Sequence, residues 1–229
     1  MIAFLWKFYQ LFYDVIIAEN RYIVILKGLG NTLLIAFCAI IIGTVIGFVL
    51  ALFKVSNNIF LRGISTVYIT VIRGIPLATQ LMIFGFVIFG PLGIDRTLIA
   101  IIGFGINSGA YVAEIIRSGI QSVDVGQMEA GRSLGLSKAV TMKKIILPQA
   151  IKSILPTYTN EFVVLIKETS VASFIAITDL TRAGDMIRNS TFNAWIPLFT
   201  VALIYLILTL GLSSVFQKLE RSLKKSDRS

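Results

Sequence analysis

The chain has 229 residues, of which 56% are hydrophobic and 14% are charged, and its mean hydropathy is +0.85. Soluble domains are nearer to ~45–50% apolar and ~25% charged, so this composition excludes an ordinary soluble domain and indicates a bundle of membrane helices. The sequence has no histidine and a single cysteine, Cys38, which excludes Ser-His-Asp catalysis, histidine metal sites and a disulfide within the chain. We therefore expect neither a catalytic residue nor a metal site.

The first 22 residues predict an amphipathic helix that lies on the membrane surface. Trp6, Tyr9 and Tyr13 are aromatic residues of the kind that prefers the headgroup level. Asp14 interrupts the apolar run and no small-residue cleavage site follows, so the pattern is not that of a signal peptide. A frayed terminal segment is the alternative interpretation.

Five segments are apolar and long enough to cross a bilayer, which requires ~20 mostly apolar residues. The predicted spans are residues 23–53, 63–90, 97–118, 153–178 and 193–216. Pro76 is expected to break the second span, because proline cannot donate the helical hydrogen bond. We thus predict an all-α integral membrane protein whose membrane domain covers residues 23–220.

Lysine and arginine are distributed unevenly between the two sides of the predicted bundle. If residues 121–152 form a cytoplasmic loop, thirteen of the 21 basic residues fall on the cytoplasmic side and six on the other, with Arg73 and Lys167 inside the membrane. The positive-inside rule then predicts an N-terminus outside, a cytoplasmic C-terminus and a basic cytoplasmic tail at residues 221–229. The same bias accounts for the net charge of +9 without nucleic acid as a partner.

The long polar loop at residues 121–152 predicts two short helices joined by an elbow. Asp124 and Gln127 form a capping-box pattern, and Gly135 lies where a left-handed C-cap would end the first helix. Ser137 is placed to cap the second helix, which Pro148 is expected to terminate. A loop ordered in this way usually contacts a partner; a solvated hairpin that only connects two spans is the alternative.

Three motifs resemble those of one transporter family. Glu129-Ala130-Gly131, followed by Gly135 and by the Ile-Ile-Leu-Pro run at residues 145–148, resembles the EAA loop of bacterial ABC importer permeases. Residues 73–77 (Arg-Gly-Ile-Pro-Leu) are similar to the RGTPLL segment of the polar amino-acid permeases (HisM/HisQ-like), and residues 160–170 to their NEFVxLxKxTSL segment. The second alanine of EAA is replaced by glycine, and the threonine of RGTPLL by isoleucine. The similarity covers roughly residues 20–220.

The resemblance implies a type I ABC importer permease fold, with five transmembrane helices and a cytoplasmic coupling helix that docks on an ATPase subunit. The residues it assigns to ATPase coupling are Glu129, Ala130, Gly131, Arg132 and Gly135. It also implies several partners: an ATPase dimer that carries ATP and Mg, a second permease that is a copy or a paralogue, and an extracytoplasmic solute-binding protein. The implied location is a bacterial plasma (inner) membrane. Because the chain lacks the G-x-x-x-x-G-K-[ST] motif, we expect no cofactor in this chain and ATP hydrolysis on the separate subunit.

Charged and amide side chains are also predicted at mid-membrane depth, where each charge costs ~2.5–3.5 kcal/mol on insertion scales. At ~1.5 Å per residue, four spans bring such groups to one level. They supply cations for a substrate carboxylate and anions for its ammonium group. The candidate substrate-binding residues are Arg73, Asn107, Asn160, Glu161, Lys167 and Glu168. Internal ion pairs that hold the bundle together are the alternative.

We therefore expect a transport subunit, not an enzyme, that translocates polar amino acids by alternating access. A carboxylate in excess of what a zwitterion needs favours cationic substrates such as arginine, lysine or histidine. Glutamine, glutamate or cystine are the alternatives within the family. A channel-like membrane protein and an intramembrane enzyme are the rivals from other classes, and the second is disfavoured by the lack of histidine and of a suitable acidic pair.

Overall fold

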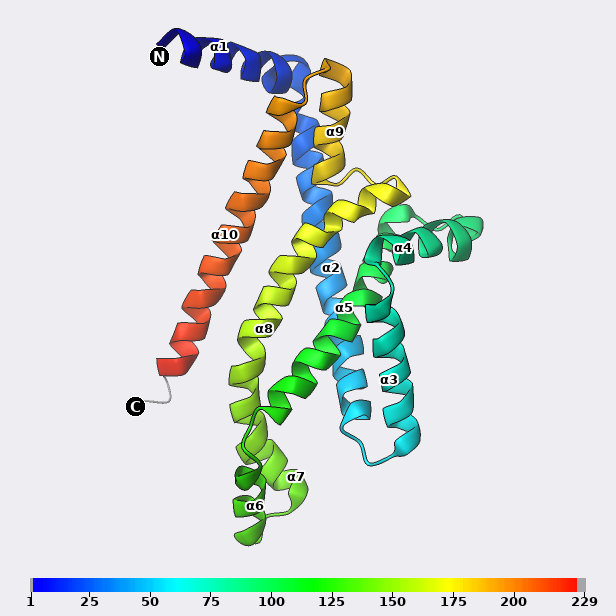
Figure 1. Cartoon of the computed structure of the whole chain (residues 1–229), viewed down its shortest axis with the longest axis vertical. Coiled ribbons are helices and arrows are strands. Elements are labelled where there is room, and N and C mark those ends of the chain that lie inside the picture. Colours follow the sequence, from blue (N-terminus) through cyan, green and yellow to red (C-terminus); the bar gives the residue numbers. More distant parts are fainter. Residues whose placement is uncertain (1, 226–229) are drawn as a thin grey trace. The chain divides into compact units, whose positions relative to one another are not determined.

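The computed structural model describes residues 2–225, and every regular element among these residues is helical (Figure 1). The α-helices are α1 (Ile2–Phe12), α2 (Tyr22–Lys54), α3 (Ile59–Gly74), α4 (Leu77–Met82), α5 (Arg96–Gln121), α6 (Val125–Ser133), α7 (Lys138–Thr141), α8 (Leu147–Glu168), α9 (Leu180–Thr191) and α10 (Trp195–Lys225). Shorter π and 3-10 turns are η1 (Tyr13–Ile17), η2 (Ala18–Asn20), η3 (Ile83–Ile88), η4 (Gly90–Leu92), η5 (Met142–Ile146) and η6 (Thr169–Ile175). The predicted all-α class is confirmed.

The chain divides into two compact units. Unit 1 contains residues 1–38, 76–104 and 165–210, and unit 2 contains residues 39–75, 105–164 and 211–229. Four of the long helices, namely α2, α5, α8 and α10, pass from one unit into the other. Both units are therefore built from parts of the same long helices.

Among the described residues, three helices are long and apolar enough to cross a membrane: α2, α5, and α10 as far as Ser222. A fourth candidate is the broken pair of α3 with residues Leu77–Leu92. These four coincide with the first, second, third and fifth predicted spans. The fourth predicted span, residues 153–178, corresponds to α8 and η6. These two elements are too polar to join the set of candidate spans, so the prediction that they cross the membrane stays a prediction. Residues 221–225 of the predicted tail are helical, and 226–229 lie outside the described residues.

The second predicted span breaks at the proline that the sequence indicates. α3 ends at Gly74, and Ile75 and Pro76 take extended backbone with ψ of 133° and 135°. α4 then begins at Leu77, because the carbonyl of Pro76 accepts a hydrogen bond from the Gln80 N–H at 3.1 Å. The break therefore follows from the restricted backbone at proline and at the residue before it.

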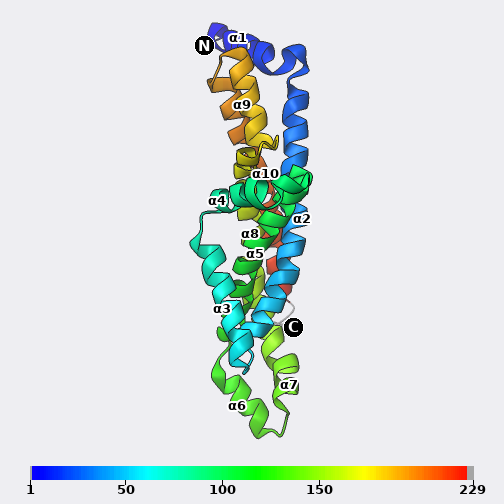
Figure 2. The ribbon, with the colours of Figure 1, turned by 90° about the vertical axis from the view of Figure 1, so that its right-hand side faces the viewer.

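Unit 2 contains the second half of α2, packed closely on α5 and flanked by α3 (Figure 2). A Cβ placed on Gly43 would lie 2.9 Å from the Cβ of Ser108, and one on Gly109 would lie 2.7 Å from Cγ2 of Ile46. The two small-xxx-small motifs, residues 43–47 and 105–109, thus pack one helix of the chain against another. These glycines therefore serve packing within one chain.

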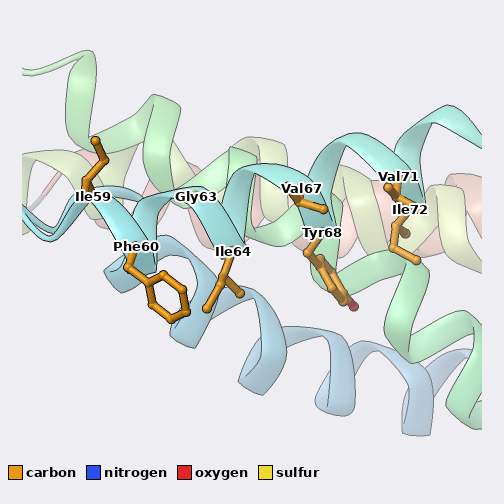
Figure 3. Close-up of a pocket in the computed structure, with 8 residues that line it drawn as sticks. All are labelled: Ile59, Phe60, Gly63, Ile64, Val67, Tyr68, Val71 and Ile72. Carbon is orange, nitrogen blue, oxygen red and sulfur yellow. The ribbon is translucent and has the colours of Figure 1, made fainter.

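Helix α3 joins this pair through hydrogen bonds from its inner face. Ser65 Oγ donates to the carbonyl of Leu50 at 2.9 Å, and the Tyr68 hydroxyl donates to the carbonyl of Ile106 at 2.9 Å. Another face of α3 is apolar and open, and it carries a cavity of about 760 Å³ (Figure 3). The residues that line it are Ile59, Phe60, Gly63, Ile64, Val67, Tyr68, Val71 and Ile72. An exposed apolar surface of this extent is typical of contact with a membrane or with another protein.

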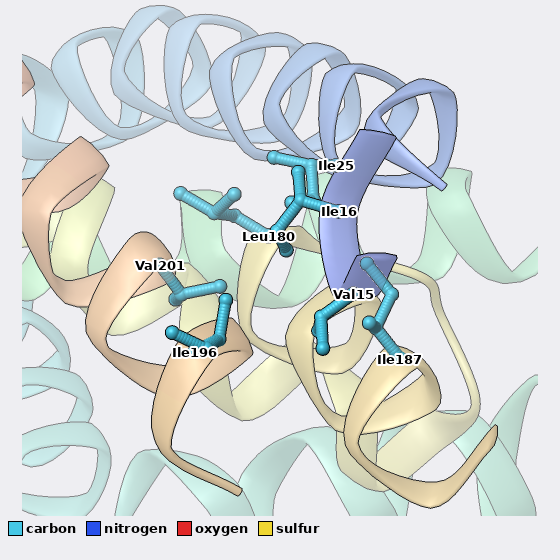
Figure 4. Close-up of a cluster of buried hydrophobic side chains, with 7 residues drawn as sticks. All are labelled: Val15, Ile16, Ile25, Leu180, Ile187, Ile196 and Val201. Atoms are coloured by element: carbon cyan, nitrogen blue, oxygen red, sulfur yellow. The ribbon is translucent and has the colours of Figure 1, made fainter. Parts of the chain in front are cut away.

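Unit 1 has a buried apolar cluster to which four elements contribute (Figure 4). Its members are Val15 and Ile16 of η1, Ile25 of α2, Leu180 and Ile187 of α9, and Ile196 and Val201 of α10. Two hydrogen bonds between α2 and the start of α9 add to this apolar packing. Asn31 Nδ2 donates to the carbonyl of Thr178 at 2.8 Å, and Thr32 Oγ1 accepts from the N–H of Leu180 at 3.1 Å. The start of α9 is therefore fixed against α2 by both apolar and polar contacts.

The predicted N-terminal surface helix corresponds to α1, which ends at Phe12. Aromatic side chains of α1 and of the adjoining η1 form a ladder, with ring centroids 6.0 Å apart for Trp6 and Tyr9 and 6.4 Å apart for Tyr9 and Tyr13, the first residue of η1. All three rings are exposed. Exposed tryptophan and tyrosine are typical of the headgroup level, and the location of α1 at the membrane surface stays a prediction.

Candidate functional site

The polar loop between α5 and α8 folds into the helical hairpin that its capping residues predict. Asp124 Oδ1 accepts a hydrogen bond from the Gly126 N–H at 2.6 Å and starts α6. At the other end Gly135 has φ of +82°, and the Leu136 N–H donates to the carbonyl of Gly131 at 3.1 Å. This is the left-handed helix ending that glycine favours, so the predicted elbow is confirmed. We call residues 124–146 the coupling hairpin, after the role that the sequence resemblance predicts for them.

The second arm of the coupling hairpin begins as predicted but does not end as predicted. Ser137 Oγ accepts from the Val140 N–H at 3.3 Å and caps α7. The expectation that Pro148 terminates this arm is wrong, because the chain stays helical through η5 and continues into α8. A π turn widens the helix just before the proline, and proline is tolerated in the first turn of the helix that follows.

Close packing between the two arms depends on Gly131. A Cβ at this position would lie 2.5 Å from Cγ2 and 2.9 Å from Oγ1 of Thr141, and 3.3 Å from Cδ1 of Ile145. Thr141 is fully buried, and its hydroxyl donates to the carbonyl of Ser137 at 3.0 Å, which holds its rotamer. Of the five predicted coupling residues, Gly131 is therefore the one that packs inside the hairpin.

The other four predicted coupling residues lie on the surface of the hairpin. Glu129, Ala130, Arg132 and Gly135 are exposed. Arg132 Nη1 also donates to the carbonyl of Leu136 at 2.9 Å, so its guanidinium supports the elbow. Two neighbouring apolar side chains that the sequence analysis did not single out are strongly exposed: Leu134 is 81% and Val125 is 73% accessible. The hairpin therefore presents a mixed charged and apolar surface.

In unit 2, α5 and α8 bring polar side chains together inside an apolar bundle. Ser108 Oγ donates to Oε1 of Glu161 at 3.3 Å, and both side chains are buried. Asn107, the residue before Ser108, is also buried. Two of the predicted substrate-binding residues thus lie on helices joined by a buried polar contact.

A second polar contact links α8 to α2 in the same unit. The Thr44 hydroxyl donates to the carbonyl of Ile40 at 2.6 Å, and the Tyr158 hydroxyl lies 2.5 Å from Thr44 Oγ1. Because the single hydroxyl proton of Thr44 is used, Tyr158 is the donor of this bond. Sequence reasoning missed Thr44, Ser108 and Tyr158. The sequence signal for two of them is their nearness to predicted site residues, since Ser108 follows Asn107 and Tyr158 lies three residues before Glu161.

Arg73 lies at the end of α3 and contacts α5. Its guanidinium carbon is 4.9 Å from the ring centroid of Tyr111, which is a cation–π geometry. Asn160 is exposed and lines a cavity of about 210 Å³ between α8 and α10, in which Thr159 Oγ1 donates to Oε1 of Glu220 at 3.0 Å. Arg73 and Asn160 are therefore accessible to a ligand, whereas Asn107 and Glu161 are buried.

The remaining two candidates belong to unit 1. Lys167 is exposed and Glu168 is half-buried at the C-terminal end of α8. The structure thus describes four of the six candidates in unit 2 and two in unit 1. A single substrate pocket that contains all six stays a prediction.

Glu114 and Arg117, near the C-terminal end of α5, form an ion pair three residues apart on one helix. Arg117 Nη2 lies 2.7 Å and Nε 3.0 Å from Glu114 Oε2. Arg117 Nη1 also donates to Oε1 of Gln121. The charge of Glu114 is therefore compensated by a residue on its own helix.

Comparison with known proteins agrees with this architecture. Residues 43–225 match the family of binding-protein-dependent transport system inner membrane components. The chain is 41% identical over 201 residues to a putative glutamine transport system permease protein of Rickettsia bellii, covering 87% of this chain and 92% of that protein. It is 40% identical over 205 residues to the arginine transport system permease protein ArtQ of Bacillus subtilis, covering 89% and 94%.

A solved structure of an amino acid ABC transporter with histidines contains a chain that is 43% identical. The TM-score is 0.82, and the match covers 87% of this chain and 94% of that chain. This chain therefore belongs to the family of binding-protein-dependent transport system inner membrane components, and it is an amino-acid ABC importer permease with the type I fold.

Proposed function

We propose that this permease imports polar amino acids by alternating access, driven by ATP hydrolysis on a separate ATPase dimer that docks on the coupling hairpin. The observation that carries this proposal is the exposure of Leu134 and Val125 on an ordered hairpin outside the candidate spans. Large apolar side chains on an ordered polar loop are typical of a protein contact. Glu129 and Arg132, exposed on the same arm, supply polar contacts at its rim.

The other partners follow from the family and from the distribution of charge. The translocation unit contains a second permease, which is a copy of this chain or a paralogue, and an extracytoplasmic solute-binding protein delivers the substrate. ATP and Mg are held by the ATPase subunits. The excess of basic residues on the hairpin side supports a bacterial plasma membrane location with the N-terminus outside and the C-terminus in the cytoplasm.

The substrate is a cationic amino acid in this proposal. Glu161, buried beside Ser108, and Glu168, half-buried at the end of α8, are two carboxylates on one helix. A zwitterion needs one carboxylate for its ammonium group, so the second is available for a cationic side chain. The relatives that transport arginine and glutamine, by their names, support a substrate within this range. Glutamine is the second candidate, because a neutral side chain needs only one of the two carboxylates.

Uptake into proteoliposomes tests this proposal. The permease is reconstituted with an ATPase and a solute-binding protein of the same organism, and radiolabelled arginine and glutamine are supplied in competition. We expect ATP-dependent uptake in which arginine is preferred by about tenfold, the discrimination that ~1.4 kcal/mol provides. Uptake that does not depend on ATP would contradict the coupling, and an equal preference for glutamine would contradict the cationic substrate.

A further inference from the structure

A second polar cavity in unit 2 lies away from the candidate substrate residues. Its volume is about 560 Å³, and it is lined by Lys54, Val55, Arg62, Glu114, Arg117 and Gln121. These residues come from the end of α2 and the residue that follows it, the first turn of α3 and the C-terminal end of α5. Three helix ends thus converge on one cavity that contains three cations and one carboxylate.

The charges of this cavity are only partly compensated. Glu114 is paired with Arg117, so that pair is close to neutral. Lys54 Nζ donates to the hydroxyl of Thr66 at 2.7 Å, and this uncharged partner leaves the ammonium charge in place. The exposed guanidinium of Arg62 forms no hydrogen bond or ion pair within residues 2–225. Two net positive charges therefore face the cavity and are available to an anion.

The neighbouring residues place the cavity at the edge of the hydrocarbon layer. Residues 28–53 of α2 carry no charge, and Lys54 is the first charged residue after this run. On the other side of the turn, Ile59 and Phe60 in the first turn of α3 are 76% and 72% exposed. Such apolar side chains need an apolar environment, whereas the ends of lysine and arginine side chains extend to the headgroup level.

We propose that this cavity binds the phosphate group of an anionic phospholipid, with Lys54 and Arg62 as the principal donors. Basic pockets between membrane helices recognise anionic headgroups, and the guanidinium geometry of Arg62 suits a phosphate oxygen pair. The exposed side chains of Val55, Ile59 and Phe60 favour a lipid over a soluble anion, because they give the acyl chains an apolar surface beside the charged cavity. In the proposed orientation of the permease, this phospholipid lies in the cytoplasmic leaflet, and only this assignment rests on the proposed function.

Lipid retention by the purified full-length chain tests this proposal. The chain is placed in phosphatidylcholine nanodiscs that contain phosphatidylglycerol, and bound phosphatidylglycerol is counted by native mass spectrometry after release. We expect Arg62→Gln to lower the affinity about fivefold and Lys54→Gln/Arg62→Gln to lower it about 25-fold, since each cation near the surface contributes ~1 kcal/mol. The matched control is Lys218→Gln/Arg221→Gln, which removes two exposed cations from the end of α10 and leaves the cavity intact.

Equal retention by the cavity variants and by the control variant would overturn the proposal. Excess inorganic phosphate provides the second arm of the experiment. If it displaces phosphatidylglycerol as effectively from the parental chain as added phosphatidylglycerol does, the site recognises a free phosphate and the lipid assignment is wrong. Because the guanidinium of Arg62 forms no hydrogen bond or ion pair within residues 2–225, Arg62→Gln remains informative if the double variant is unstable. The measurement does not depend on transport, so its failure is distinguishable from failure of the proposed import function.

Discussion

Gly131 and Thr141 approach so closely that a single methyl group does not fit between them. A Cβ on Gly131 would lie 2.5 Å from Cγ2 of the fully buried Thr141. The glycine that replaces the second alanine of the EAA pattern is therefore matched to a threonine ten positions further along. This pair sets the distance between the two arms of the coupling hairpin.

The first prediction concerns this pair. Gly131→Ala should destabilise the hairpin by about 1–3 kcal/mol through overpacking. It should also weaken capture of the ATPase in a pull-down from membranes. Gly131→Ala/Thr141→Ala should recover most of the binding, because it removes both the Cγ2 and Oγ1 atoms that the new Cβ meets. If Gly131→Ala binds the ATPase like the parent, the close approach does not matter for docking.

The second prediction concerns the elbow. Gly135 has φ of +82°, and a Cβ at this position would meet no heavy atom of residues 2–225 within 4 Å beyond its chain neighbours, so a substitution there has a backbone cost only. Gly135→Val should lose about 1–2 kcal/mol of hairpin stability, and Gly135→Asn, which tolerates this backbone region, should lose less. We expect Gly135→Val to insert in the membrane normally. With this variant, the rate of ATP hydrolysis by the ATPase should no longer rise during transport. If this variant transports at the rate of the unaltered chain, the elbow is not needed for coupling.

The third prediction concerns the substrate. Glu168→Gln removes a half-buried carboxylate with little change in shape. Uptake of arginine should fall at least tenfold, while any uptake of glutamine should be retained, because only the cationic side chain needs the second carboxylate. Initial rates in proteoliposomes measure both. An equal loss for the two amino acids would show that Glu168 has a structural role, and the cationic preference would be wrong.

The fourth prediction concerns the orientation in the membrane. Ser137, at the cap of α7, and Asn189, near the end of α9, are the two positions to be labelled. In a chain with Cys38 replaced by serine, Asn189→Cys should react with a membrane-impermeant thiol reagent in intact cells. Ser137→Cys should react only after the cells are opened. The reverse pattern would reverse the assignment based on lysine and arginine.

The features that sequence reasoning predicts correctly are local ones. Asp124, Gly135 and Ser137 act on backbone groups within four residues of themselves, so their effect is visible in the sequence. The prediction for Pro148 is wrong because the effect of this proline depends on the hydrogen-bond register of the preceding turn, and a π turn is not visible in residue types.

The polar contacts between helices are harder to predict. Ser108 and Tyr158 are uncharged residues that an apolar helix tolerates on any face, so nothing in the sequence selects Glu161 and Thr44 as their partners. The packing of α2 on α5 is easier to anticipate, because two small-xxx-small motifs leave room for close approach wherever they meet. Assignment of partners between helices thus needs the structure, whereas caps and elbows do not.

The helical continuity through η5 has a mechanical consequence. From Lys138 to Glu161 the backbone remains helical, with no coil segment in between. At ~1.5 Å per residue, this stretch spans up to about 35 Å. It contains the π turn η5 and Pro156 inside α8, which are the points at which such a helix bends. In the coupling proposed above, a movement of the hairpin is therefore transmitted to the buried Glu161 through continuous helix, with bending confined to these two points.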